Sequence, residues 1–345
     1  MKKLKKLSVK ESFHTTIFKK NLMSKEDVDD LSSLMSHGFT FIDSLRIVAD
    51  SRNVRIINNV LCRLRLGEDM IKVMKSVCPK EYRNDFFSFI EFLSFKDSLV
   101  LCSKIYNEEK KEKEVLKKSL IYPVFLFFIT TIGLFIFIDV CLPILIRLID
   151  DFKSDSTYLI NFRIVSLLII KMVMFLSVIL IISLFFFTRQ KYQVSFYKFV
   201  NRYLKIKLFK QWVSSNFARY FYHCSSIGCK TKETITILKK LSRKPLIIFL
   251  AEDIDENLLC GNSMEDAIKS IYLDYSLQRF MTIAIHSSSM EKTLDSYIKL
   301  SHEKIKKRIR VTTKLLQLFT YSVVGIILIF VYQILILPLS IMSQI

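Results

Sequence analysis

The sequence is poor in the residues that build tight loops and reactive sites: its 345 residues include only 6 glycines, 5 prolines and 1 tryptophan. Scattered glycines cannot build a phosphate-binding loop, and no GxxxxGK(S/T) pattern occurs. The 5 histidines form no HxxxH or HExxH pattern, so no metal site is expected. The 7 cysteines include no CxxC pair, and no GxSxG motif is present. We therefore expect a protein that is not an enzyme and has no cofactor.

Apolar residues and positive charge are both abundant. Hydrophobic residues make up 51% of the chain, and the net charge is +20. Disordered, collagen-like and disulfide-stapled proteins have other compositions. A simple bundle of membrane helices carries less charge, so the two properties must occupy different parts of the chain. The composition indicates a membrane protein with large basic parts outside the bilayer.

Three segments are long and apolar enough to cross a bilayer, which takes about 20 residues. They lie at 119–142, 164–188 and 315–341, and we expect a transmembrane helix at each. Asp139 and Lys171 are charged residues within them. The first 20 residues form a basic tail without an apolar core, so no cleavable signal peptide is expected.

Lys and Arg close to the spans indicate how the chain crosses the membrane, because they favour the cytoplasmic side. The sequences KKEKEVLKK before the first span and KIKKRIR before the third are strongly basic. The loop at 143–163 holds only three basic residues. We expect a cell-membrane protein with domains 21–118 and 189–314 in the cytoplasm, the loop and the C-terminus outside, and the N-terminus inside.

The basic residues are dispersed along the two cytoplasmic domains. Solvated helix faces beside anionic lipid headgroups account for most of them. A nucleic-acid surface is the alternative interpretation, but no recognition fold is visible, so no direct nucleic-acid partner is expected.

The glycines indicate an internal repeat. Three pairs recur at offsets of 190, 194 and 192 residues, and two prolines add a fourth pair at 195; the pairs are Gly38 with Gly228, Gly67 with Gly261, Gly133 with Gly325, and Pro143 with Pro338. In a glycine-poor chain this spacing predicts a duplicated unit of soluble domain and span. The extra span at 164–188 returns the chain to the cytoplasm.

Each soluble copy has the spacing of amphipathic helices. Gly38 suits a helix C-terminus, and Thr40 is placed to cap the next helix, with Asp43 three residues on. In the second copy Gly228 is followed by Thr231 in the corresponding role. Strand signals are absent from the sequence. The fold class is therefore predicted as all-α, with two repeated cytoplasmic helical bundles and three transmembrane helices.

The two intramembrane charges, Asp139 and Lys171, are both expected near the outer leaflet. An unpaired charge in the bilayer is costly, which favours a pair between the first two spans. The alternative is that each side chain extends separately to the outer interface. Both interpretations stay open from the sequence.

Several segments together resemble one family, the inner-membrane platform proteins of type II secretion and type IV pilus machines (GspF/PilC-like). The resemblance covers residues 22–341. Its carriers are LSSLMSHGFTFIDSL (31–45), LRLGEDMIKVM (64–74), IYPVFL (121–126), HCSSIGCKTKETI (223–235), LLCGNSMEDAI (258–268) and LPLSI (337–341). The composition and length are similar to the Gram-positive competence branch, ComGB.

The resemblance implies a non-enzymatic assembly platform. Its partners would be a cytoplasmic secretion ATPase, pilin or pseudopilin subunits and the lipid bilayer, and a homo-oligomer is expected. It also implies a role in DNA uptake during competence or in protein secretion. The segments around Gly38, Gly67, Gly228 and Gly261 would be structural turns and partner contacts. A membrane sensor or transporter component is the alternative function.

Overall fold

The computed structural model describes residues 22–151, 189–287 and 289–342, with scattered positions between 160 and 186. Every element in these ranges is helical, in agreement with the predicted all-α class. The chain divides into two compact units: residues up to Lys110 with Tyr197–Leu300, and Lys111–Phe196 with the residues from Ser301 onward. The domain boundaries expected from charge stay a prediction.

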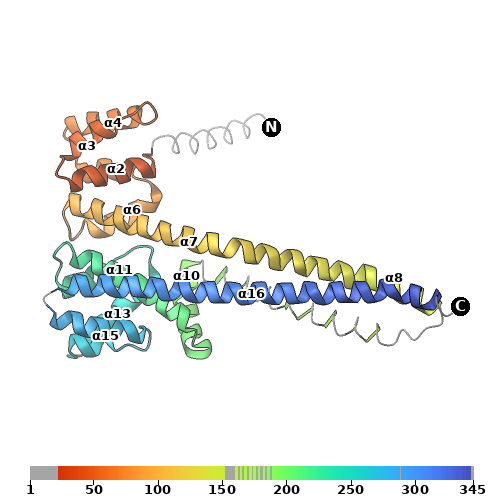
Figure 1. Cartoon of the computed structure of the whole chain (residues 1–345). Helices are drawn as coiled ribbons and strands as arrows, with labels where there is room; N and C mark the ends of the chain where they lie inside the picture. Colours follow the sequence, from red (N-terminus) through yellow and green to blue (C-terminus); the bar gives the residue numbers. More distant parts are fainter. Residues whose placement is uncertain are drawn as a thin grey trace, which may run out of the picture. The chain divides into compact units, whose positions relative to one another are not determined.

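The first unit contains two helical bundles (Figure 1). The first bundle comprises residues 22–110 and the second comprises residues 197–300. The first holds α2 Lys25–Ser36, α3 Phe41–Val48, α4 Val54–Arg65, α5 Met70–Val77, α6 Lys80–Phe89 and the start of α7 Phe95–Ile136. The second holds the end of α10 Gln190–Phe199, the π-turn η2 Val200–Leu204, α11 Lys207–Ser225, α12 Thr231–Lys239, α13 Pro245–Leu259, α14 Met264–Ile268, α15 Tyr275–His286 and the start of α16 Met290–Met342.

Each bundle closes around apolar side chains that recur at helical spacing. The first core includes the fully buried Leu31, Leu45, Ile57, Val73, Phe86 and Phe89; the second includes Phe217, Phe221, Leu238, Leu250, Ile254 and Leu277. Burying each such side chain stabilises the fold by about 1.5–3 kcal/mol. Packing of these amphipathic faces, more than intrinsic propensity, therefore holds the short helices in place.

Four helices end in the same left-handed glycine turn. Gly38, Gly67, Gly228 and Gly261 have φ of +98°, +82°, +88° and +87°. At the first turn Phe39 N–H donates to Leu34 C=O (3.2 Å) and Gly38 N–H to Met35 C=O (3.1 Å), which is the Schellman pattern. The other three turns make the corresponding two bonds. Glycine is required here because a Cβ is strained at these φ values.

Each glycine turn leads directly into the next helix, whose N-cap lies two residues after the glycine. The four N-caps are Thr40, Asp69, Lys230 and Ser263. As predicted, Thr40 accepts a hydrogen bond from the Asp43 N–H at 3.2 Å. The expected role of Thr231 was wrong, because the cap position belongs to Lys230. There the Lys230 N–H donates to Glu233 Oε2 at 3.0 Å.

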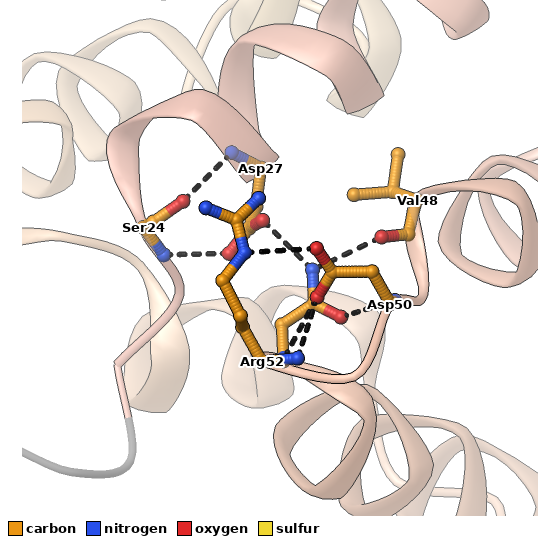
Figure 2. A network of polar contacts seen from close by, with 6 residues as sticks. Ser24, Asp27, Val48, Asp50 and Arg52 are labelled. Atoms are coloured by element: carbon orange, nitrogen blue, oxygen red, sulfur yellow. Dashed lines mark hydrogen bonds and ion pairs between the residues drawn. The ribbon is translucent and has the colours of Figure 1, made fainter.

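A polar network fixes the start of the first bundle (Figure 2). Ser24 caps α2 and exchanges two bonds with Asp27, whose second carboxylate oxygen accepts from Asn53 Nδ2 at 2.8 Å. Asp50 in turn accepts from the backbone and side chain of Arg52. The network joins the N-terminus of α2 to the loop before α4. It satisfies the buried Asp27, which would otherwise be costly inside a bundle.

The second unit contains a long apolar helical stretch. Val124–Ile144 is long and apolar enough to cross a membrane, with a mean hydropathy of 2.5, and it is the one stretch that meets this test among the described residues. The expected span at 164–188 falls largely outside the residues that the structure describes. The expected span at 315–341 belongs to α16, where many side chains are likewise outside the description.

The candidate span contains a π-helical turn, in which the backbone hydrogen bonds reach five residues back instead of four. Residues Phe137–Cys141 form the π-turn η1, and the Leu142 N–H donates to the Phe137 C=O, five residues back. Pro143 is the second residue of the helix that follows, α8 Leu142–Asp151. Proline has no N–H to donate and its ring crowds the carbonyl four residues earlier. The wider π-turn makes room for this proline without ending the helix.

Candidate functional site

The glycine turns present apolar side chains at the surface. The Gly38 turn carries Phe39, which is 47% exposed, and Ile42, which is 45% exposed. Leu66 beside Gly67 is 77% exposed, and Leu259 near Gly261 is 80% exposed. Such side chains suit contact with another protein, since exposed apolar groups clustered at a fixed turn lose little entropy on binding. The partner-contact role of these turns stays a prediction.

The two charges that the sequence analysis expects within the spans, Asp139 and Lys171, lie in the second unit. Asp139 is exposed within η1, and Lys171 is exposed as well. Their pairing stays a prediction.

A second site, which the sequence did not single out, lies between the two bundles. We call it the junction cluster: it consists of Asp85, Glu108, Glu109, Arg219, Tyr220, His223 and Lys244. Its acids come from α6 and α7, and its cations, phenol and imidazole come from α11 and the N-terminus of α13. The cluster thus joins helices that are more than 100 residues apart in the chain.

Glu108 joins α7 to two side chains of α11. Its Oε2 lies 3.3 Å from Arg219 Nε and 3.1 Å from His223 Nε2. Arg219 is 1% exposed, whereas the Glu108 side chain is 45% exposed. A buried guanidinium needs an opposite charge, and Glu108 supplies it from the neighbouring bundle. Arg219 and His223 are four residues apart, so they share one face of α11.

Glu109, the next residue of α7, makes a second set of contacts. Its Oε1 accepts from Lys244 Nζ at 2.5 Å and from the Tyr220 hydroxyl at 3.1 Å. The side chains of Lys244 and Glu109 are only 24% and 14% exposed, so solvent screens this ion pair weakly. The Lys244 ammonium also lies 5.5 Å from the centre of the Tyr220 ring. Consecutive carboxylates of α7 therefore hold the start of α13 and the middle of α11.

Burial sets the protonation behaviour of the cluster. Burial raises the pKa of the Asp85 carboxyl, and the Lys244 charge opposes part of that rise. Burial, followed by the nearby Asp85 and Glu109 carboxylates, raises the pKa of the Tyr220 hydroxyl well above its usual range. The phenol therefore stays neutral and acts as a hydrogen-bond donor. Chemically the cluster neutralises buried charge and fixes two bundles against each other.

Two further contacts lie at the edge of this junction. Lys240 Nζ lies 3.2 Å from Glu91 Oε2 and 4.7 Å from the centre of the Phe92 ring. Ser88 and Ser242 hydroxyls lie 3.2 Å apart. The Lys240 and Glu91 side chains are both more than half exposed, so this pair contributes little stability. These contacts extend the junction to the C-terminal end of α6.

The cysteines are free thiols. Burial raises the pKa of Cys78 to about 12 and the pKa of Cys102 and Cys224 far above the usual range. Such thiols behave as small apolar side chains. Among the described residues, no group of three or more His, Cys, Asp or Glu side chains is placed to hold a metal ion.

One signal in the sequence points to the junction cluster. Arg219 and His223 interrupt the apolar spacing of α11, one on either side of the core residue Phe221. Charged residues at positions that face a core are costly unless they are paired, and this spacing marks them as functional or structural candidates. Their partners on α7 have no local signal, because Glu108 and Glu109 belong to a run of charged residues.

Comparison with known proteins gives two matches. Residues 217–338 match the family model described as type II secretion system (T2SS), protein F. The chain is also 22% identical over 313 residues to ComG operon protein 2 of Bacillus subtilis (strain 168), a match that covers 88% of this chain and 97% of the relative. The matched family region runs from the second half of α11 through α12, α13, α14 and α15 to most of α16, so it contains one side of the junction cluster. Residues 217–338 therefore resemble the type II secretion system protein F family, and most of the chain is similar to ComG operon protein 2.

Proposed function

We propose that the chain is a non-enzymatic platform in the cell membrane for the assembly of a type IV pilus or pseudopilus. It couples a cytoplasmic secretion ATPase to the insertion of pilin subunits, and the filament supports DNA uptake in competence or protein secretion. The observation that carries the proposal is the family match at residues 217–338, together with a ComG relative that aligns over 88% of the chain.

The helices support a coupling role. Helix α7 carries Glu108 and Glu109 of the junction cluster and continues without interruption to Ile136, within the candidate span. A continuous helix transmits displacement along its axis far better than a loop does. The junction cluster joins this helix to α11 and α13, so force applied to either bundle reaches α7.

We also propose that the chain is a duplicated unit with three spans, multi-pass in the cell membrane and assembled as a homo-oligomer. In this topology both bundles face the cytoplasm, and residues 143–163 and the C-terminus lie outside. The four equal glycine turns, each with its N-cap two residues later, support the duplication. The basic residues beside the spans support the orientation.

A strain that lacks the chain tests the platform role. We expect processed pilin-like subunits to remain in the membrane while surface filaments and DNA uptake disappear, because only the assembly step is lost. Immunoblots of membrane fractions, electron microscopy and transformation frequency measure the three outcomes. Normal filaments would exclude a platform and favour the sensor or transporter alternative.

A pair of variants on α3 tests the partner contact at the Gly38 turn. Ile42→Asp places a charge on the turn surface, whereas Ile47→Asp places it on a different face of the same helix at similar exposure (45% and 56%). We expect Ile42→Asp alone to abolish filaments and co-purification of the ATPase. Equal effects of the two variants would remove the turn from the contact surface.

Cysteine labelling tests the topology. In a variant without native cysteines, Ser154→Cys lies in the proposed outer loop, and restored Cys62 and Cys260 are exposed side chains of the two bundles. A membrane-impermeant maleimide applied to intact cells should label position 154 alone, and all three after lysis. Labelling of position 62 or 260 in intact cells would contradict the proposed orientation.

A further inference from the structure

The second bundle carries a surface that neither the family nor the platform role assigns. We call it the η2 face. Its apolar side chains are exposed by 45–66% and its cations lie among them; the members are Lys198, Phe199, Arg202, Tyr203, Leu204, Lys205, Ile206 and Lys207. The rings of Phe199 and Tyr203 lie 5.0 Å apart, so two aromatic side chains are presented together.

The opposite side of the same segment is anchored in the bundle. Tyr197 and Val200 are buried, and the Tyr197 hydroxyl donates to the Tyr272 C=O at 2.5 Å. Asn201 Nδ2 donates to the Ile271 C=O at 3.1 Å. The segment is therefore held by its inner side, and its outer apolar side chains stay exposed because they face away from the core.

A left-handed residue shapes the end of this face. Lys205 has φ of +48°, an unusual conformation for a residue other than glycine, and its N–H donates to the Val200 C=O at 2.8 Å. The reversal ends η2 and exposes both Leu204 and Ile206, which are 58% and 45% exposed. Local strain that exposes apolar groups is a common feature of binding surfaces.

The charge of this region is of one sign. The sequence contains no Asp or Glu from residue 156 to residue 232. From the packed elements, Asp274 acts on the adjacent Tyr197 and Lys210, and it already accepts from the Ser276 N–H at the start of α15. The four Lys and Arg cations of the η2 face are thus available to an anionic partner.

We propose that the η2 face docks on the anionic phospholipid surface of the membrane. Aromatic and aliphatic side chains mixed with cations suit the interface, where apolar groups enter the headgroup region and cations meet lipid phosphates. Residue 198 lies ten residues after Thr188, the end of the apolar stretch, so the chain holds this face within about 35 Å of the bilayer. This distance rests on the proposed second span.

A single tryptophan placed on the η2 face tests the docking. Trp212 is the only tryptophan of the chain, so Trp212→Phe gives a silent background for Tyr203→Trp. The full chain is placed at one copy per nanodisc, made either of phosphatidylcholine alone or of a mixture with phosphatidylglycerol. Brominated phosphatidylcholine in each serves as a contact quencher. Phe39→Trp is the control on a distant turn, and Phe175→Trp is the control for the second span.

We expect bromolipid to quench Tyr203→Trp in the anionic nanodiscs and to leave Phe39→Trp unquenched. One cation near an anionic surface changes the ratio of docked to undocked chains by about fivefold. We therefore expect that ratio to fall by about fivefold in each of three variants: Arg202→Gln, Lys205→Asn and Lys207→Gln. Phosphatidylcholine nanodiscs test the same electrostatic contribution without any change of the fold.

Three outcomes would overturn the docking. In the first, the tryptophan of Tyr203→Trp stays unquenched in both lipids, and in the second it is quenched equally in both. In the third, it becomes protected from solvent only when two copies share a nanodisc. The last outcome would assign the face to a second copy of the chain. Loss of quenching at Phe175→Trp reports instead on the second span, so failure of the topology is distinguishable from failure of the docking.

Discussion

The two bundles share a helix-and-turn framework and differ in how they satisfy one polar residue. Nine residues before the first glycine of each bundle stand Asp29 and Arg219. Asp29 accepts from the hydroxyls of Tyr82 (2.9 Å) and Ser103 (2.6 Å), both in its own bundle. Arg219 pairs with Glu108 of α7. The same helix position therefore closes the first bundle on itself and makes the second depend on the junction cluster.

The largest expected effect separates these two residues. Glu108→Gln leaves the Arg219 guanidinium, which is 1% exposed, without its carboxylate and should lower the free energy of unfolding of the second bundle by about 3 kcal/mol. Urea unfolding of the chain in nanodiscs, followed by Trp212 fluorescence, measures it.

The matched control is Asp29→Asn, which keeps an acceptor for both hydroxyls and should cost about 1 kcal/mol. Adding Arg219→Met to Glu108→Gln should recover most of the loss, because both charges are then absent. Equal losses for the two single variants would mean that the bundles do not differ in the way proposed.

The next largest effect is the loss of stability when a turn glycine is replaced, and it should be equal in the two bundles. Gly38→Ala and Gly228→Ala place a Cβ at φ of +98° and +88° with no atom within 4 Å of it. The cost is therefore backbone strain alone, about 1–2 kcal/mol at each site. Hydrogen exchange of the helices on either side of each turn measures it. Gly133→Ala, at a helical glycine without positive φ, should cause no loss. Unequal losses at the two turns would break their equivalence.

A smaller effect on stability is expected at the N-cap of α12, where the second bundle has a lysine instead of a residue with a short side-chain oxygen acceptor. Lys230 stands where Thr40 and Ser263 each accept a backbone N–H with a side-chain oxygen. Lys230→Ser supplies that acceptor and should stabilise α12 by about 0.5–1 kcal/mol. Thermal unfolding monitored by Trp212 measures the gain, and Ser263→Lys should give a loss of similar size. A neutral result at Lys230 would show that Glu233 alone already satisfies this helix start.

The smallest expected effect is a change in how the free energy of unfolding depends on pH. It is expected for a variant of Asp85. Burial raises its pKa in the folded chain above the ordinary 3.8, so the folded state binds this proton more tightly than the unfolded state does. Stability from the group is present below the ordinary pKa and is lost as pH rises through the raised one. Asp85→Asn should flatten this fall in unfolding measurements across the acidic range.

Asp50 is the matched carboxylate of opposite behaviour. Bonds from Arg52 lower its pKa, so its contribution is present above the ordinary pKa and is lost as pH falls. Asp50→Asn should therefore remove the part of the fall in unfolding free energy at low pH that comes from this carboxylate. The same slope for both variants would contradict the difference in burial between the two sites.

The sequence predicted features that depend on a few neighbouring residues. The helical class follows from apolar spacing, and the Thr40 cap follows from its distance to Asp43. The glycine at a helix end follows from its tolerance of positive φ. The cap predicted at Thr231 was wrong by one residue, because the backbone turn, and not the presence of a hydroxyl, places the cap two residues after the glycine in all four cases.

The junction cluster was beyond this kind of reasoning. Glu108 and Arg219 are 111 residues apart, and Glu109 and Lys244 are 135 apart, so no local period relates them. On α7 the two acids look like any solvated charges, because the run from residue 108 to 118 is mostly charged. Their role depends on which bundle packs against that side of α7, which is a property of the tertiary fold.

The four left-handed glycines also determine how far such a chain can diverge. A Cβ added at any of the four would meet no atom within 4 Å, so the positive φ is what a substitution there would strain. The glycine itself cannot be replaced without strain, whatever else is altered. Distant relatives should therefore be easier to find by the spacing of four glycines, each followed two residues later by a helix start, than by overall identity.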